Sequence, residues 1–381
     1  MINHLYIHIP FCRSKCHYCG FYSETSLSGQ RINGYPELVA RELALWGEQC
    51  SEVSNMRPRS IYIGGGTPSL LGAGGFNALA DALRKSIDLG QLSEWSVELN
   101  PSSASFELLE TMRAAGVNRL TFGVQSFNQE VLTLINRTHT PLQAIESVQR
   151  ARQAGFQNIG LDLVAALPGV SPKLWQQELQ QSIELAPTHI SVYNLSIEPA
   201  TRLAAMIAEG LPTPDEDQQM EALAMAEETL TRQGYTRYEI SNYALNGYEC
   251  QHNLGIWRGN DYLGLGPAAA SRINNHRMEN NSDLEAYEQH LSHFSPPPRN
   301  TELLTAEDDG VERSLFALRL HEGFSPAECG THFSVPAAKV YQWEQSLKNL
   351  AYTGAVEQGG KAWRLTRRGR EICDHVIREL C

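Results

Sequence analysis

The 381-residue sequence has no uninterrupted apolar run of about 18 residues, the length that a membrane-spanning helix needs. Its first residues, Met1 to Tyr6, show neither the basic region nor the cleavage pattern of a secretory signal peptide. We therefore expect a cytoplasmic protein. Thiols stay reduced in that compartment, so the eight cysteines are expected to be free thiols or metal ligands and not disulfides.

Clusters of lysine and arginine are also missing. The chain has 31 basic and 43 acidic residues, which gives a formal net charge of −12. A surface that binds nucleic acid or anionic lipid needs concentrated positive charge. We therefore expect no nucleic-acid partner, and no more than peripheral contact with targets that are themselves bound to a membrane.

The chain does have the length and the apolar content for a large domain and a smaller one, because hydrophobic residues make up 42% of it. We predict a main domain over residues 1–235, an extension and linker over residues 236–300, and a C-terminal domain over residues 301–381. The sequence leaves open whether the protein is a monomer or a homodimer.

Three cysteines near the start of the chain carry the strongest chemical signal. Cys12, Cys16 and Cys19 form a Cys-x3-Cys-x2-Cys loop directly after a strand-like segment. Iron–sulfur cubanes that are held entirely by protein use four thiolates. Three nearby cysteines without an obvious fourth therefore predict a [4Fe-4S] cluster in which one iron is open to a ligand.

Two other metal sites use similar residues. A zinc site could combine these cysteines with His17 or with a distant ligand, because zinc accepts mixed cysteine and histidine sets. His17 lies between Cys16 and Cys19, however, and would be hard to aim at the same ion. A bacterial ferredoxin needs Cys-x2-Cys-x2-Cys-x3-Cys-Pro, and this chain has neither that spacing nor the last cysteine.

Short apolar strands alternate with helical segments through the first half of the chain, a pattern that is typical of a parallel α/β sheet. A doubly wound sheet and a partial barrel both fit this alternation. The predicted strands lie near residues 4–9, 60–64, 96–100, 119–124, 158–163 and 189–194. The predicted helices lie near residues 34–49, 75–88, 104–115, 141–154 and 172–185.

Polar or glycine-rich residues follow most of these strands. In either architecture, functional residues collect at the carboxyl ends of the strands. Glycine lets a ligand approach the backbone closely, carboxylates and amides bind hydroxyl or amino groups, and arginine binds a carboxylate. Singly, each is more often a turn residue or a solvated side chain, but together they predict a polar ligand site. The residues are Gly65, Gly66, Thr67, Glu98, Gln125, Arg137 and Asp162.

The cysteine loop, Tyr6, Tyr18 and these strand-end residues resemble, in order and spacing, the radical S-adenosylmethionine (SAM) superfamily, and within it the oxygen-independent coproporphyrinogen III oxidase-like group. The resemblance implies a partial (β/α)6 TIM-like barrel. It implies that SAM binds the open iron and is split by an electron into methionine and a 5′-deoxyadenosyl radical. It also implies that SAM contacts Tyr6, Tyr18, Gly65, Gly66, Thr67, Glu98, Gln125, Arg137 and Asp162.

Cys250 and His252 are further candidate ligands. They alternate with Gln251, so an extended segment would place both on one face, where a thiolate and an imidazole could hold a haem iron. The alternative is a polar turn in which the histidine satisfies a backbone carbonyl. Haem chaperones of the same group carry a His-Asn-x-x-Tyr-Trp segment implicated in haem binding, and this chain has Ile256 at the tyrosine position.

Two departures from the oxidase pattern favour the HemW-type haem chaperones. The oxidases have a further cysteine two residues after the third, where this chain has Phe21, and a long N-terminal extension, whereas the first predicted strand here begins close to Met1. The resemblance thus implies one [4Fe-4S] cluster, SAM, and haem as a cargo for recipient apoproteins, with an unidentified electron donor and no assigned catalytic residue. The alternative is an oxygen-independent coproporphyrinogen III oxidase that decarboxylates porphyrinogen propionates.

The last 80 residues predict a smaller, mostly helical domain. Three helical patterns are followed by a hairpin that turns at Gly359 and Gly360, and then by a last helix, an order that suggests a winged-helix-like fold. The 336–350 helix offers only two lysines, so we expect a packing or protein-contact domain and not a DNA-binding one. Before it, residues 273–282 and 295–300 are predicted to be a loop and a linker.

Overall fold

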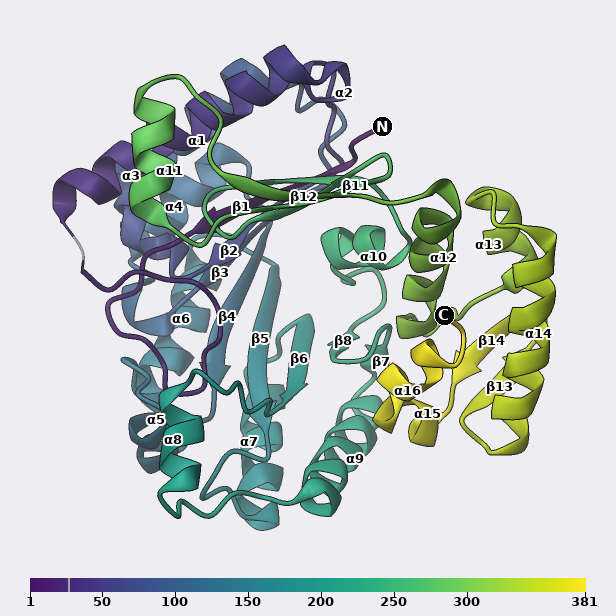
Figure 1. Cartoon of the computed structure of the whole chain (residues 1–381). Coiled ribbons are helices and arrows are strands. Elements are labelled where there is room, and N and C mark those ends of the chain that lie inside the picture. The colour runs from purple at the N-terminus through teal and green to yellow at the C-terminus, as the bar shows by residue number, and fades with distance from the viewer. Residues whose placement is uncertain (27) are drawn as a thin grey trace.

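The computed structural model describes residues 1–26 and 28–381, and within them one large sheet is flanked by helices (Figure 1). The twelve strands of this sheet have the order β12-β11-β10-β9-β1-β2-β3-β4-β5-β6-β8-β7. Its two edge strands do not pair with each other, so the described sheet is a partial barrel and not a closed one. The parallel centre consists of β1 (His4–Ile9), β2 (Ser60–Gly65), β3 (Glu94–Leu99), β4 (Arg119–Gln125), β5 (Asn158–Ala165) and β6 (His189–Asn194).

All six predicted strands are confirmed. Along each strand, side chains point alternately to the hydrophobic core and to the inner face of the sheet. In β1, Leu5, Ile7 and Ile9 are fully buried in the main hydrophobic core. Successive strand residues point to opposite faces. Tyr6 and His8, the residues between them, accordingly line a cavity on the inner face of the sheet.

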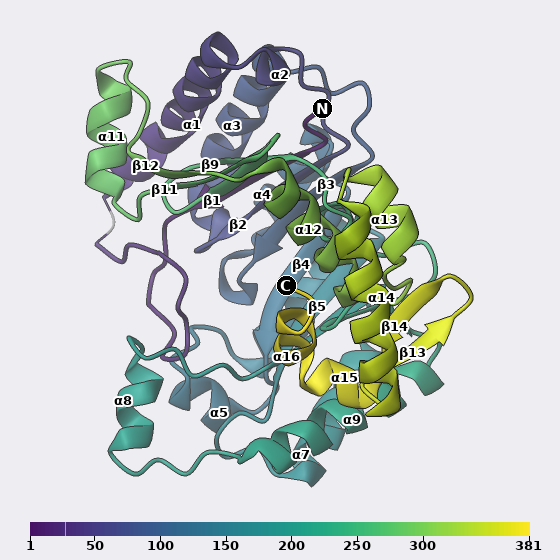
Figure 2. The same cartoon turned by 45° about the vertical axis from the view of Figure 1, so that its right-hand side comes forward.

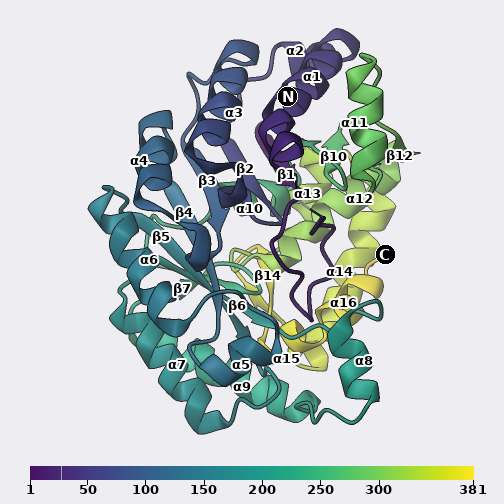
Figure 3. The ribbon, with the colours of Figure 1, turned by 90° about the vertical axis from the view of Figure 1, so that its left-hand side faces the viewer.

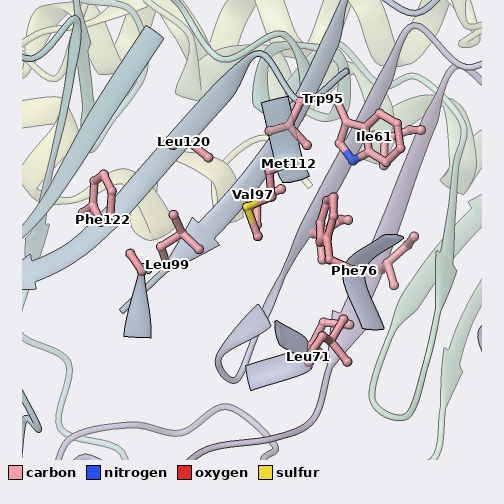
Figure 4. Close-up of a cluster of buried hydrophobic side chains, with 14 of the residues drawn as sticks. Ile61, Leu71, Phe76, Trp95, Val97, Leu99, Met112, Leu120 and Phe122 are labelled. Atoms are coloured by element: carbon pink, nitrogen blue, oxygen red, sulfur yellow. The ribbon is translucent and has the colours of Figure 1, made fainter. Parts of the chain in front are cut away.

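The helices between the strands bury apolar side chains against the outer face of the sheet. Figure 4 shows part of this core, where Phe76 and Trp95 are almost completely buried. Burying a side chain of this kind contributes about 1.5–3 kcal/mol. The flanking helices are α1 (Gly29–Gln49), α2 (Ser51–Ser54), α3 (Gly72–Ser86), α4 (Phe106–Ala115), α6 (Pro141–Gln153), α7 (Pro172–Glu184) and α9 (Glu216–Arg232).

Side-chain caps set where several of these helices begin. Ser105, Thr140 and Ser171 each accept a hydrogen bond from a backbone N–H in the first turn of α4, α6 and α7. Shorter elements stand at the ends of the strands: η1 (Pro68–Leu71), η2 (Pro101–Ser103), α5 (Gln129–Leu134) and α8 (Arg202–Ala208).

The stretch predicted as an extension and linker adds strands to both edges of the central sheet. β7 (Thr236–Arg237) and β8 (Asn242–Ala244) follow β6, with β8 antiparallel to β6. On the other side, β9 (Tyr262–Leu265) pairs in parallel with β1. The stretch also contains α10 (Gln251–Trp257), β10 (Ala270–Ile273), β11 (His276–Asn280), α11 (Leu284–Ser292) and β12 (Arg299–Leu303).

The prediction of a loop over residues 273–282 is wrong. β10 and β11 form an antiparallel hairpin in which Ile273 pairs with His276. Asn274 takes a positive φ of 53° at the turn, a conformation that asparagine tolerates well. The strands were missed because β11 is polar and lacks the apolar alternation by which strands are recognised.

The C-terminal part has its own hydrophobic core, which includes Phe324, Trp343, Leu347 and Trp363. Figure 2 shows it beside the large sheet. The predicted order of three helices, a hairpin and a final helical segment is confirmed. Its elements are α12 (Ala306–Phe316), η3 (Ala317–Arg319), α13 (Pro326–His332), α14 (Ala337–Tyr352), β13 (Val356–Gly359), β14 (Ala362–Leu365), α15 (Arg367–Glu371) and α16 (Cys373–Arg378).

Buried ion pairs join this part to the sheet. Arg272 on β10 contacts Asp309 at 2.6 Å and Glu312 at 2.8 Å, and Arg313 on α12 contacts Asp261 at 2.8 Å. Breaking a buried pair by removing one partner leaves an uncompensated charge, so these contacts hold α12 firmly against the sheet. In the part of the chain that the structure describes, no helix has the length and the apolar character that crossing a membrane requires.

Candidate functional site

The three cysteines of the motif lie on the loop between β1 and α1, which crosses the carboxyl ends of the parallel strands (Figure 3). Its backbone is held at several points. The N–H of Cys12 donates to the carbonyl of Glu24 at 3.0 Å, the N–H of Cys19 donates to the carbonyl of Cys16 at 3.1 Å, and the N–H of His17 donates to the carbonyl of Ile135 at 3.0 Å. The loop is therefore anchored both to itself and to the end of α5.

A cavity of about 570 Å³ brings this loop together with the strand ends. All three motif cysteines and almost all of the predicted SAM-binding residues line it. They are Cys12, Cys16, Tyr18, Cys19, Gly65, Gly66, Thr67, Glu98, Gln125, Arg137 and Asp162. Of the predicted set, Tyr6 lies elsewhere: its hydroxyl is 3.0 Å from His8 Nδ1, and it lines a second cavity.

The glycines after β2 have a packing role of their own. Gly65 has a φ of +99°, and a Cβ there would lie 2.5 Å from the ring of His8. A Cβ on Gly66 would lie 2.6 Å from the carbonyl oxygen of Phe11. Glycine is thus required for the loop to cross the end of β1. The same close packing places the backbone of Gly65 and Gly66 at the cavity wall.

Two carboxylates face the cavity from β3 and β5. Burial and the nearby Asp162 raise the pKa of Glu98 to about 7, and burial raises the pKa of Asp162 to about 6. Glu98 Oε1 accepts a hydrogen bond from the Tyr62 hydroxyl at 2.7 Å. Carboxylates removed from water in this way gain from a ligand that supplies hydroxyl or amino donors.

Arg137 connects the cysteine loop to β4. Its Nη1 donates to Cys16 Sγ at 3.5 Å, and its Nη2 donates to the carbonyl of Gly123. Between Gly123 and Gln125 the strand register shifts, and Gln125 takes a positive φ of 69°. Such strained residues cluster at functional sites.

The donor set fits an iron–sulfur cluster better than a zinc ion held through His17. Nδ1 of His17 contacts the carbonyl of Leu134 at 2.8 Å, and His17 does not line the cavity that the three cysteines share. Among residues 1–26 and 28–381, no three His, Cys, Asp or Glu side chains come close enough to hold a single metal ion. In an iron–sulfur cluster each thiolate binds a different iron atom. The three sulfurs therefore need to line one cavity but do not need to meet at one ion.

A second cavity, of about 690 Å³, adjoins the first. The two share part of their walls, including Glu98, Phe21 and Tyr193. Phe21 is 69% exposed. The remaining wall of the second cavity is rich in aromatic rings and imidazoles: Tyr6, His8, Tyr22, Tyr62, His252 and Tyr262. A flat aromatic ligand could therefore lie directly beside a ligand of the first cavity.

The extended Cys250–His252 segment that would place both side chains on one face is wrong. Cys250 is the residue before α10, and His252 lies in that helix. The Glu94 carboxylate caps the helix, because it accepts hydrogen bonds from the N–H groups of Gln251 at 2.8 Å and His252 at 3.1 Å. A cap supplied by a strand far away in the sequence leaves no local signal.

The two candidate haem ligands consequently lie in different surroundings. Cys250 is completely buried, its thiol donates to Glu94 Oε1 at 3.4 Å, and burial raises its pKa to about 12. It lines neither cavity. His252 lines the second cavity, and its Nδ1 lies 2.9 Å from Ser60 Oγ, so the alternative of a histidine bonded to a backbone carbonyl is not observed either.

Sequence reasoning missed His8 and Tyr62, which also line the second cavity. A usable signal was present for His8, which is two residues from the candidate Tyr6 on β1. Residues that are two apart on a strand share a face.

The fold is that of a radical SAM protein. The model of the Radical SAM superfamily matches residues 6–181 of the chain. A solved structure, coproporphyrinogen III oxidase (HemN) from Escherichia coli, superposes with a TM-score of 0.84 over 100% of this chain and 90% of that one. At 24% identity, this likeness concerns the fold.

Comparison with curated relatives shows to which family within this superfamily the chain belongs. The chain is 34% identical to "Heme chaperone HemW" of Lactococcus lactis over 98% of this chain and 96% of the relative. It is 32% identical to the Bacillus subtilis protein of that name, over 98% and 97%. The Escherichia coli protein of that name is 36% identical over 71% and 70%. The chain belongs to the HemW family.

Proposed function

We propose that this protein is a cytoplasmic haem chaperone with the radical SAM fold, which binds one [4Fe-4S] cluster, SAM and haem and delivers haem to target apoproteins. The observation that carries the proposal is the single cavity into which the three cysteines, Gly66, Glu98 and Asp162 converge from distant parts of the chain. A cluster site and a nucleoside site that were far apart would not support it.

In this proposal Cys12, Cys16 and Cys19 hold the cluster, and Nη1 of Arg137 donates a hydrogen bond to the sulfur of Cys16. When bound, the cluster supplies one electron to SAM. Glu98 and Asp162 accept hydrogen bonds from the hydroxyl or amino groups of SAM, and their burial makes each such bond stronger than it would be in water. Tyr18, Gly65, Gly66, Thr67 and Gln125 complete the walls of the SAM site, whereas Tyr6 lines the adjoining cavity.

Haem is assigned to the second cavity. Its aromatic wall suits a flat macrocycle, and His252 supplies an imidazole of the kind that binds haem iron. Phe21 favours a chaperone over an oxidase, because it stands where the oxidase pattern has a further cysteine. The relatives that are named heme chaperones support the same choice. Cys250 has no part in this assignment, since its thiol is buried against Glu94.

The test uses the full-length protein after anaerobic reconstitution of the cluster. Haem and SAM are titrated into it, and the haem-loaded protein is then mixed with a haem-free acceptor such as apomyoglobin. We expect binding of both ligands and transfer of haem. In parallel, the protein is supplied with SAM, a reductant and coproporphyrinogen III. Anaerobic formation of protoporphyrinogen IX would establish the oxidase and overturn the chaperone.

A further inference from the structure

His252 is the last member of a buried chain of hydrogen-bonding side chains. Its Nδ1 lies 2.9 Å from Ser60 Oγ, and Ser60 Oγ lies 2.8 Å from His4 Nδ1. His4 Nε2 lies 3.1 Å from Asn260 Nδ2. His252, Ser60 and His4 are each at most 3% exposed, so water does not compete for these contacts. We call these four side chains the His252 relay.

The relay is formed by side chains from separate elements that pack closely together. Its members come from β1, β2, α10 and the turn after α10. A Cβ on Gly255 of α10 would lie 2.0 Å from His4 Nε2, so only glycine at that position lets His4 reach its neighbours. Since Nδ1 of His252 is engaged by Ser60, Nε2 is the ring nitrogen that remains for a ligand in the second cavity.

The hydrogens of the relay can be arranged in two ways, and each gives every contact within the relay one donor and one acceptor. With the Asn260 amide nitrogen toward His4, Asn260 donates to His4 Nε2, His4 Nδ1 donates to Ser60, and Ser60 donates to His252 Nδ1. Nε2 of His252 then carries a hydrogen and cannot bind iron. A neutral imidazole has one donor and one acceptor nitrogen, so the state of one nitrogen fixes the other.

In the second arrangement, the donor and the acceptor are exchanged at every contact of the relay. If the Asn260 amide turns its oxygen toward His4, His4 Nε2 donates to that oxygen, Ser60 donates to His4 Nδ1, and His252 Nδ1 donates to Ser60. Nε2 of His252 then presents a lone pair to the second cavity. The two amide orientations occupy the same volume, and the hydrogen bonds alone distinguish them.

We propose that Ser60, His4 and Asn260 are positioning residues that hold His252 in the tautomer set by the orientation of the Asn260 amide, and that the tautomer with a free Nε2 lone pair is the one that binds haem iron. Only the part of this proposal that concerns haem iron rests on the proposed function. Partners that orient a ligating histidine typically account for a 10–100-fold difference in metal affinity.

The first test measures how His252 binds haem iron. Ferrous haem is bound to the parent protein and to Ser60→Ala, and the iron–histidine stretching band is recorded by resonance Raman spectroscopy. We expect Ser60→Ala to shift or lose this band and to weaken haem binding at least about tenfold. Ser60→Thr keeps the hydroxyl and should restore both. Ser96→Ala is the matched control, because Ser96 is also a fully buried strand serine and its hydroxyl has no partner among the described residues. An unchanged band in Ser60→Ala alongside a changed one in His252→Ala would overturn the proposal.

The second test needs no haem. In protein labelled with ¹⁵N in its histidines, the His252 resonances are assigned by their loss in His252→Ala. We expect shifts of one pure tautomer in the parent and averaged shifts in Ser60→Ala. Averaged shifts already in the parent would refute the relay. If the relay is found but the parent protein binds no haem, the proposed function fails while the control of the tautomer stands.

Discussion

The hydroxyl of Tyr62 donates a hydrogen bond to Glu98 Oε1 over 2.7 Å, and this contact links the two cavities. The ring of the same tyrosine lies against His252, with a centroid distance of 5.1 Å and an interplanar angle of 31°. One side chain on β2 therefore touches both a carboxylate assigned to SAM and the imidazole assigned to haem. The sites share walls, so changes in one are expected to affect the other.

Tyr62→Phe tests this link. The substitution removes a donor that lowers the pKa of Glu98, while the ring against His252 remains. Without this donor the pKa of Glu98 rises further, so less of the carboxyl group is ionised near pH 7 and SAM binding should weaken about tenfold. Equilibrium dialysis of SAM against the reconstituted protein gives the measurement. Tyr262→Phe, which alters another tyrosine of the second cavity, should leave SAM affinity unchanged, and equal losses in both variants would contradict the link.

Glu98→Gln should remove a pH dependence of folding. The folded-state pKa of Glu98 is about 7, above its ordinary 4.5, because of burial and the charge of Asp162. Its contribution to the free energy of unfolding is therefore fully present below about pH 4.5 and is lost as the pH rises to about 7. At pH 8 the variant should be more stable by up to about 3 kcal/mol. Urea unfolding of the cluster-free protein from pH 5 to 8 measures this, and parallel curves for parent and variant would refute it.

Each of the motif cysteines should be essential for the cluster. Replacement of Cys12, Cys16 or Cys19 by alanine should abolish the brown absorbance and the bound iron of the anaerobically reconstituted protein, because a cluster with only two protein thiolates is not retained. Cys329→Ala, in the C-terminal helical part, is the control and should bind iron as the parent does. Stoichiometric zinc in the parent with no iron uptake would show that the redox interpretation is wrong.

Cys250→Ala should affect stability and not haem. The thiol is fully buried and donates to Glu94, so its loss leaves a small cavity and one fewer hydrogen bond to the carboxylate that caps α10. We expect the free energy of unfolding to fall by about 1–2 kcal/mol. The absorption spectrum of bound haem should match that of the parent. A changed haem spectrum without a change in stability would restore Cys250 as a ligand candidate.

Gly65→Ala should be more damaging than a change at a comparable glycine. Both Gly65 and Gly72 have positive φ, but a Cβ on Gly65 would meet the ring of His8 at 2.5 Å, whereas nothing lies within 4 Å of a Cβ on Gly72. Gly72→Ala measures the backbone cost of alanine at positive φ, about 1–3 kcal/mol. Gly65→Ala should cost about 1–3 kcal/mol more than that, since a steric clash with His8 is added. Urea unfolding measures both, and equal losses would show that the contact with His8 relaxes freely.

Much of the site was predictable because its residues follow a repeated local pattern. Each central strand shows the apolar alternation of a buried sheet. Gly66 directly follows β2, Glu98 is the next-to-last residue of β3, and Asp162 lies in the carboxyl-terminal half of β5. Carboxyl ends of parallel strands meet at one edge, so these residues were expected to come together, and all three line the same cavity. The polar hairpin of β10 and β11 was missed because it lacks that alternation.

The sequence by itself determined the α/β alternation, the spacing of the three thiols and the resemblance to the radical SAM superfamily, since these depend on periodicity and on residues that are close along the chain. Only the tertiary structure decided the surroundings of Cys250 and His252. Glu94, 156 residues before Cys250, caps α10 and buries the thiol, while Ser60 and His4 hold the imidazole at the second cavity. Contacts of this kind arise when strands and helices from distant segments pack together, and no local pattern records them.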